Sequence, residues 1–355
     1  MDKTPIMGLP AKTWQFVPIE GAMCRDGSAT GIGVNMNPSS KNLMIFLEGG
    51  GACFNALTCS GNASSFSEAG FNACVGSGTG TCTALSLAGG GGGILNRSDM
   101  HNPMADWNLV YVPFCTGDVH AGNKTNATVA GVSGKQQFVG YANMTRYLAR
   151  LVPTFPGLSK VLLTGVSAGG FGAAANYVQT AKAFGSVPVY ELDDSGPPME
   201  DPYVPKCLQK AWSDTWGFEK TILADCGSDC SDPSNYTLDA SIHVAKLYPH
   251  IPFGLIEDTD DSTITFFYGF GANNCGAIPS QLSGATFTAG LLDSRMKLAA
   301  YPNVGGFIFQ NTVHTTLSSA SFDTRTAGGG DAATVNLYDW VSTLVNSGTV
   351  TNVGP

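Results

Sequence analysis

The sequence has few charged side chains, and basic ones are especially scarce. Only 13% of its 355 residues are charged, with 18 Lys and Arg against 27 Asp and Glu, and the formal net charge is −9 at pH 7. No cluster of Lys and Arg could follow a phosphate backbone, so we expect no nucleic acid partner. The same acidity disfavours a strongly polyanionic substrate.

Long apolar runs are also missing. The longest, at 43–47 and 109–113, have the length of single strands, whereas a membrane-spanning helix needs about 20 apolar residues. We therefore expect no membrane span. We find no internal repeat and no linker, so we expect a single domain over residues 1–355, and we expect it to be a monomer.

Cysteine, by contrast, is plentiful. The ten cysteines lie at positions 24, 53, 59, 74, 82, 115, 207, 226, 230 and 275. Because none of them forms a CxxC or Cys/His knuckle of zinc spacing, we expect disulfides and no metal site. Disulfides indicate an oxidising compartment, hence a secreted or periplasmic protein. The chain opens Met1-Asp2-Lys3 without an apolar segment, so we expect that a native secretion signal has been removed.

Apolar runs of strand length alternate with stretches of helical spacing along the chain. The expected strands are 43–47, 109–114, 161–164, 187–192, 252–256 and 306–310, and the expected helices are 137–152, 176–183 and 334–344. This alternation predicts an α/β fold, a mostly parallel sheet with helices on both faces. In such folds ligands gather at the carboxyl ends of the strands.

Two stretches interrupt this alternation. Residues 53–107 are rich in Gly, Ser and Cys, and residues 199–250 contain Trp212, Trp216 and three cysteines. We interpret both as loop insertions pinned by disulfides, which together could form a cap over the sheet.

A pentapeptide at the end of an expected strand carries the strongest signal of chemistry. Gly165-Val166-Ser167-Ala168-Gly169 matches the nucleophile-elbow pattern G-x-S-x-G, between an apolar strand and a helix start of small residues. Because the serine backbone is strained in so sharp a turn, its neighbours must lack bulk. The motif in this context predicts an α/β-hydrolase fold with Ser167 as nucleophile.

The topology of that fold restricts the partners of Ser167, because the triad follows the chain order Ser, acid, His. Of the five histidines, two precede Ser167, and His243 and His250 precede or abut the strand that should deliver the acid. His314, after the last expected strand, remains as the general base.

The acid is less defined. The loop 257–261 offers four carboxylates after the penultimate strand, Glu257, Asp258, Asp260 and Asp261. Asp194, after the preceding strand, is an outside candidate. Chain order alone does not choose among them.

The negative charge of an acyl-transfer intermediate needs backbone N–H donors, worth about 3 kcal/mol each. Ala168, which follows the nucleophile, supplies one. Gly50 and Gly51 could supply the others, because a glycine run after an early strand is the usual second half of such a hole.

Together these segments resemble the pectin acetylesterase and Notum family of secreted carboxylesterases. The matching segments are LEGGGAC (47–53), GGILNRSDMHNP (92–103), WNLVYVPFCTGDVHAGN (107–123), TGVSAGGFG (164–172) and DDSG (193–196), together with the spacing to His314. They extend over residues 20–320. The resemblance implies an α/β-hydrolase fold and a Ser-Asp-His triad.

The resemblance also implies individual roles. The family's D-x-x-Q-I/L pattern falls on residues 260–264 and points to Asp260 as the acid. It points to Gly50, Gly51 and Ala168 for the oxyanion hole. It further suggests a bridge between Cys24 and Cys115.

Three departures from the family bear on the substrate. Ala52 stands where the family usually has an aromatic residue in the glycine loop, Val313 replaces a cysteine beside the histidine, and Thr263 replaces the glutamine. We therefore expect a divergent member whose acyl pocket is wider or differently lined, with Ala52 as a substrate-binding position.

The leading hypothesis is a secreted serine carboxylesterase that works through an acyl-enzyme and needs no metal or organic cofactor. By resemblance its first substrate class is an acylated carbohydrate, from which it removes acetate. Longer acyl esters or a polyester come next, and a serine peptidase has less support. A non-catalytic secreted binding module on a hydrolase scaffold is the alternative of another class, and the intact triad order argues against it.

Overall fold

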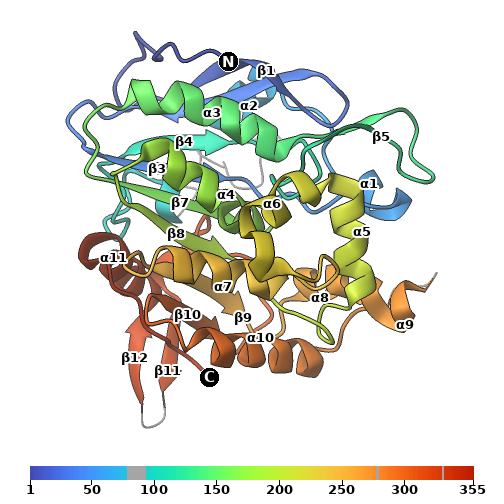
Figure 1. Ribbon diagram of the computed structural model, residues 1–355. Coiled ribbons are helices and arrows are strands. Elements are labelled where there is room, and N and C mark those ends of the chain that lie inside the picture. The colour runs from blue at the N-terminus through green and yellow to red at the C-terminus, as the bar shows by residue number, and fades with distance from the viewer. Residues whose placement is uncertain (78–92, 277–279, 330–331) are drawn as a thin grey trace.

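The computed structural model describes residues 1–77, 93–276, 280–329 and 332–355. Its centre is an eight-stranded sheet (Figure 1). The strands are β1 (Gln15–Met23), β2 (Ala29–Asn35), β3 (Asn42–Leu47), β4 (Asn108–Val112), β7 (Lys160–Val166), β8 (Val189–Asp194), β9 (Phe253–Asp258) and β10 (Val304–Phe309), in the order β1-β2-β4-β3-β7-β8-β9-β10. From β4 to β10 all neighbours are parallel, whereas β1 and β2 form an antiparallel edge. The expected mostly parallel sheet is confirmed.

Two short ladders and the helices complete the described structure. The ladders pair β5 (Lys124–Ala127) with β6 (Gln136–Phe138) and β11 (Thr326–Gly329) with β12 (Ala332–Asn336). The α-helices are α1 (Ala56–Ser60), α2 (Glu68–Ser77), α3 (Gly140–Thr154), α4 (Ala168–Phe184), α5 (Lys206–Trp216), α6 (Ile222–Cys226), α7 (Thr237–Leu247), α8 (Ser262–Tyr268), α9 (Ala272–Cys275), α10 (Gly284–Leu298) and α11 (Leu337–Ser347). Short 3₁₀ turns lie at Gly93–Leu95, Phe218–Lys220, Gly227–Cys230, Gly269–Gly271 and Ala320–Asp323.

The core lies on both faces of the sheet, because the central strands are apolar at successive positions. Along β3, Leu43 and Ile45 pack with side chains of α3 and α4, and Met44 and Phe46 pack on the opposite face with α11. Successive side chains of a strand point to opposite faces, so a continuous apolar run is what a sheet covered on both sides requires.

The expected helices differ from the observed ones mainly at their ends. Helix α4 begins at Ala168, directly after the elbow, rather than at residue 176. Helix α11 begins at Leu337 because residues 334–336 belong to β12. The antiparallel edge was not expected, since glycines interrupt the alternation of apolar residues in β2. A Cβ on Gly31 would lie 2.1 Å from the Val17 carbonyl oxygen, so the close pairing with β1 excludes a side chain there.

The cysteines form disulfides, as expected, and two of the bridges join segments far apart in the chain. The bridge between Cys24 and Cys115 is confirmed, and three further bridges join Cys53 to Cys59, Cys207 to Cys275 and Cys226 to Cys230. No described cysteine is free. None of the described helices is long and apolar enough to cross a membrane.

The two stretches interpreted as insertions take different places. In the described part of 53–107, α2 packs on β1 and β2 at the sheet edge, and residues 78–92 lie outside the described residues. Residues 199–250 fold into α5, α6 and α7, and these helices line the same cavity as Ser167.

Candidate active site

Ser167 occupies a sharp turn between β7 and α4. Its backbone has φ 57° and ψ −122°, a conformation that costs a non-glycine residue about 1–3 kcal/mol. The two glycines of the motif make room for this turn. A Cβ on Gly165 would lie 2.3 Å from the Gly169 carbonyl oxygen, and a Cβ on Gly169 would lie 2.0 Å from that of Leu47. The motif is therefore required sterically, and it presents Ser167 to a cavity.

Asp194, at the end of β8, ties this turn to the loop that carries His314. Its carbonyl oxygen accepts the Ser167 N–H at 2.7 Å. Its carboxylate Oδ2 accepts the N–H groups of Thr316 and Leu317, both at 2.7 Å. Burial raises the pKa of Asp194 to about 6, and the amides and His314 act in the opposite direction. Asp194 thus serves as an anchor between the two candidate catalytic segments.

His314 is oriented by Asp261. Its Nδ1 lies 2.7 Å from Asp261 Oδ2, and the Asp261 side chain is completely buried. A carboxylate can only accept, so the proton of the pair belongs on Nδ1, which leaves Nε2 as an acceptor. The other carboxylate oxygen, Oδ1, accepts the N–H groups of Thr263 and Ile264 at 2.8 Å each. Asp261 is therefore both the N-cap of α8 and the partner of His314.

The expectation that Asp260 orients His314 is corrected to Asp261. The half-buried Asp260 carboxyl turns toward the start of α10, where a Cβ on Gly284 would lie 2.3 Å from Asp260 Cγ. A sequence signal for Asp261 existed, since Asp directly before a helical stretch is a favoured N-cap. The D-x-x-Q-I/L pattern could not have selected it, because a match that begins at Asp261 places Thr265 at the I/L position.

The other candidate acids have different partners. Asp258 forms two bonds with the Arg325 guanidinium, at 2.6 and 2.8 Å, and also accepts the Val313 N–H at 3.3 Å. Arg325 lies 3.5 Å from the Phe309 ring centroid. Asp258 therefore contacts residues on both sides of His314 and helps to hold the segment that carries it. Glu257 is fully buried, and its pKa is raised by burial.

The glycine loop packs directly against the nucleophile. A Cβ on Gly49 would lie 3.0 Å from Ser167 Cβ. None of the hydrogen bonds of the described residues uses the N–H of Gly50, Gly51 or Ala168 as donor, so these amides are available to an incoming oxygen atom. Asn62 Nδ2 donates to the Gly50 carbonyl oxygen at 2.6 Å. In a trans peptide the N–H points opposite to the C=O, so this bond directs the Gly51 N–H away from Asn62.

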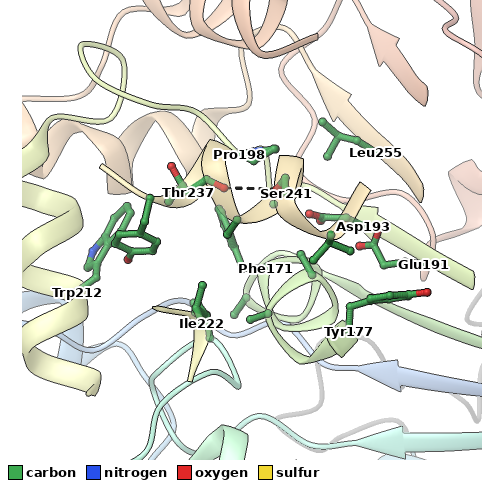
Figure 2. Close-up of a pocket in the computed structure, with 18 of the residues that line it drawn as sticks. Phe171, Tyr177, Glu191, Asp193, Pro198, Trp212, Ile222, Thr237, Ser241 and Leu255 are labelled. Atoms are coloured by element: carbon green, nitrogen blue, oxygen red, sulfur yellow. Dashed lines mark hydrogen bonds between the residues drawn. The ribbon is translucent and has the colours of Figure 1, made fainter. Parts of the chain in front are cut away.

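A cavity opens beside Ser167 and extends between α4 and α7 (Figure 2). It has a volume of about 180 Å³. Gly51, Ala52 and Ala168 line it near the nucleophile, and its walls are mainly aromatic and aliphatic. Figure 2 shows Phe171 and Tyr177 of α4, Thr237 and Ser241 of α7 and Trp212 of α5 around it. This geometry fits a long, apolar substituent next to the elbow.

Comparison with known protein families shows which family the chain belongs to. The family described as Pectinacetylesterase matches residues 13–246, more than half of the chain. The chain belongs to the pectinacetylesterase family.

Known relatives of this family member include palmitoleoyl-protein carboxylesterases. NOTUM of Drosophila melanogaster is 29% identical over 161 residues, which cover 43% of this chain and 22% of the relative. Notum2 of Xenopus laevis is 32% identical over 181 residues, 49% of this chain and 34% of the relative. The match therefore spans 22% and 34% of the length of these two curated relatives.

The fold of the family member is that of a solved relative. The crystal structure of the Wnt deacylase Notum from Drosophila, at 1.9 Å, superposes with a TM-score of 0.64 and 19% identity over 94% of this chain and 93% of that chain. The α/β-hydrolase fold is thereby shown.

Sequence reasoning missed His120, a buried residue of this family member. Its Nε2 lies 2.8 Å from the Glu48 carbonyl oxygen, just before the glycine loop. Burial lowers the pKa of His120 to about 4, so the ring is neutral and Nε2 donates its proton to that oxygen. The ring contacts Phe114 at 4.8 Å between centroids. Its place two residues after the buried Asp118, within the segment 107–123 that carried the resemblance, was the available signal.

One group of metal-ligand side chains occurs among the described residues. Ligand atoms of Asp99, His101 and Asp323 lie within 4.8 Å of one another, although no cysteine knuckle predicted a site here. None of the three belongs to the cavity lining or to the network of Ser167 and His314.

Proposed function

We propose that this chain is a serine carboxylesterase in which Ser167 is the nucleophile, His314 the general base and Asp261 the orienting acid. The observation that carries this proposal is the 2.7 Å contact between His314 Nδ1 and Asp261, on a loop that Asp194 ties to the Ser167 turn. In the described part of the chain Ser167 makes no hydrogen bond to His314, and such bonds commonly tighten when substrate binds.

The reaction follows from this arrangement. Ser167 Oγ attacks the ester carbonyl carbon and transfers its proton to His314 Nε2, while the amides of Gly50, Gly51 and Ala168 hold the developing oxyanion. The imidazolium, stabilised by Asp261, protonates the departing alkoxide and leaves an acyl-enzyme. Water then attacks the acyl carbon, gives a proton to Nε2, and the collapse of the second intermediate releases the acid and restores Ser167.

The cavity favours an acyl group longer than acetyl. Its apolar walls continue from Ala52 and Ala168 to Tyr177 and Val178, near the middle of α4. An acetyl group would leave most of this surface without contact. Removal of acetate from a polysaccharide remains a second candidate, supported by the family match.

We also propose that residues 199–250 act as a cap. Helices α5 to α7 close the cavity on the side away from the sheet and contribute Trp212, Ile222 and Ser241 to its wall. The four described disulfides support secretion into an oxidising compartment.

Ser167→Ala tests the assignment. We expect turnover of p-nitrophenyl acetate, octanoate and dodecanoate to fall roughly a thousandfold or more, with an unchanged circular dichroism spectrum. Ser347→Ala, at the exposed end of α11, is the matched control and should retain full activity. Retained turnover in Ser167→Ala would disprove the proposal. In the wild type, a kcat/KM that rises with chain length supports the long-acyl substrate, and a maximum at acetate supports the polysaccharide.

A further inference from the structure

The inner end of the cavity is acidic. Glu191 and Asp193 lie two residues apart on β8, so both side chains point to the same face of the sheet. They are 6% and 4% exposed and both line the cavity that Ser167 enters. Figure 2 shows both acids among the lining residues, and Glu191 interacts with the nearby Tyr177. Two carboxyl groups thus end a cavity whose walls are otherwise mainly apolar.

Each of these carboxyl groups has an oxygen atom without a hydrogen-bond partner. These atoms are Glu191 Oε1 and Asp193 Oδ1. A buried polar atom left unpaired costs about 1–3 kcal/mol. The neighbouring strand places the apolar Phe253 and Leu255 opposite the two acids, and Gly170 and Gly196 leave room for the Asp193 carboxyl group without offering a side-chain partner. The unpaired oxygens therefore point to a ligand group.

The distance from the nucleophile follows from the strand register. Val166, which precedes Ser167, pairs with Asp194, and Glu191 lies three residues earlier on β8. At about 3.3 Å per residue, Glu191 is roughly 10 Å below the elbow. Because each carbon of an extended alkyl chain advances less than the ~1.5 Å of a C–C bond, about eight or more carbons separate Glu191 from the reacting carbonyl. Asp193 pairs with Gly165 and therefore lies between Glu191 and the elbow.

The protonation of the pair selects the ligand. Burial, and then the charge of Asp193, raise the pKa of Glu191. Burial, and then the charge of Asp194, raise the pKa of Asp193, against the Gly196 amide. A neutral carboxyl group offers one O–H donor and one carbonyl acceptor, and a hydroxyl group matches both. A plain alkyl end would leave the oxygens unpaired, and a charged end, whether an anion or an ammonium group, would have to be stripped of water.

We propose that Glu191 and Asp193 form a polar subsite for a hydroxyl group carried by the acyl chain, so that the preferred substrates are esters of long hydroxy acids. This inference rests on the proposed esterase function and adds the class of its acyl group. The apolar wall binds the methylene chain, and the two carboxyl groups bind its hydroxylated end.

Paired substrates test this directly on the intact protein. The probes are p-nitrophenyl esters of dodecanoic, 12-hydroxydodecanoic and 12-aminododecanoic acid, with the 8- and 10-carbon pairs alongside. We expect wild-type kcat/KM to be at least about tenfold higher for the hydroxy ester than for the plain ester at one or more lengths. A site that hydrogen-bonds a hydroxyl group discriminates against a substrate that lacks it, because the polar groups of the site are then left unpaired. A ratio near or below one at every length, or a preference for the amino ester, would overturn the inference.

Variants locate the effect. Glu191→Leu should bring the ratio of hydroxy to plain ester to about one or below, Glu191→Gln should retain part of the preference, and Glu200→Leu, at a surface ion pair with Lys297, should leave the ratio unchanged. The ratio compares two substrates on one preparation, so a loss of folded protein cancels. If Glu191→Leu does not fold, Asp193→Asn replaces it, and a ratio unchanged in the folded variant contradicts the subsite.

A separate measurement tests the proposed esterase function independently of the subsite. Wild-type hydrolysis of p-nitrophenyl acetate, lost in Ser167→Ala, shows that the esterase works whatever the ratio. Absence of any ester turnover contradicts the function, whereas turnover without hydroxyl preference contradicts only the subsite.

Discussion

Asp261 combines two kinds of hydrogen bonding in one carboxylate. One oxygen accepts two amides of the first turn of α8, and the other accepts His314 Nδ1. The cap fixes the position of the carboxylate, and the fixed carboxylate fixes the imidazole. Asp260, one residue earlier, has its side chain on the other side of the backbone, against α10.

Asp261→Asn should reduce kcat by about 10³–10⁴ with little change in stability. The amide oxygen can still cap α8, but the NH₂ group would donate to Nδ1 and move the imidazole proton to Nε2, which then cannot accept from Ser167. Steady-state kinetics with a p-nitrophenyl ester and urea unfolding measure the two effects. Asp260→Asn is the control and should stay within a few fold of the wild type. An equal loss in Asp260→Asn would return the role to that residue.

Asn62 is expected to affect catalysis without touching the substrate, because it holds the peptide whose N–H group would bind the oxyanion. Removal of its bond to the Gly50 carbonyl in Asn62→Ala lets the Gly50–Gly51 peptide rotate and misaligns one oxyanion donor. We expect kcat to fall about 10- to 100-fold with KM changed much less, because the oxyanion forms only in the transition state. Asn346→Ala, at an exposed position of α11, should show neither effect. A rise in KM with unchanged kcat would contradict this positioning role.

Single residues also show where sequence reasoning reached its limit. Ser167 and His314 followed from a motif and a chain order, both of which depend on local geometry and topology. The choice of Asp261 required placing the acid to within one residue in a loop with four acids. The feature that sets Asp261 apart from the other three is that it caps the N-terminus of α8. Asn62 and His120 act through backbone carbonyls, which no side-chain motif encodes.

At the scale of elements, the segment after β10 is held by its neighbours rather than by its own secondary structure. Asp194 binds the amides at 316 and 317, and Asp258 binds Arg325 and the Val313 amide. Central strands and the elbow were predictable from apolar runs and small residues. The antiparallel edge was not, because glycines such as Gly31 are chosen there for close backbone pairing.

Arg325→Met should destabilise the protein by about 3–5 kcal/mol, since it leaves the Asp258 carboxylate buried and unpaired. The free energy of unfolding in urea measures this. Adding Asp258→Asn should recover part of the loss because the unpaired charge is removed. Lys210→Met, which breaks an exposed pair with Asp214, is the control and should cost at most about 0.5 kcal/mol. If the double variant is no more stable than Arg325→Met, the buried charge is not the cause.

At the scale of the whole molecule, acidic side chains are concentrated inside as well as outside. Buried carboxyl groups line the carboxyl ends of β8 and β9 and the loops after β4 and β9. They include Asp118, Glu191, Asp193, Asp194, Glu257, Asp258 and Asp261. Composition gave the net charge of −9 but not this distribution, because burial of an acid depends on which loops cover it.

These buried acids predict an unusual dependence of stability on pH. Burial raises the pKa of Asp118 and of Asp194 to about 6, from 3.8, and it raises the pKa values of Glu191, Asp193 and Glu257 as well. Between pH 4 and 6 the folded state therefore binds more protons than the unfolded chain, and the free energy of unfolding falls as pH rises through this range. For Asp118 and Asp194 the stabilisation is fully present below the unfolded pKa of 3.8 and is lost as pH rises through about 6.

Urea unfolding at pH 5, 6, 7 and 8, with the disulfides intact, measures this slope. We expect the midpoint to be higher at pH 5 than at pH 7. Asp118→Asn should flatten the slope, because its side chain stays neutral in both states and can still accept from the Gly140 amide. Asp232→Asn is the matched control: its exposed carboxyl has a pKa lowered to about 2 by Lys206 and Ser234, so it titrates below this range and its removal should leave the slope between pH 5 and 7 unchanged. A midpoint that falls from pH 7 to pH 5 in the wild type would mean that the interior acids are ionised at little cost and that water reaches them in the folded protein.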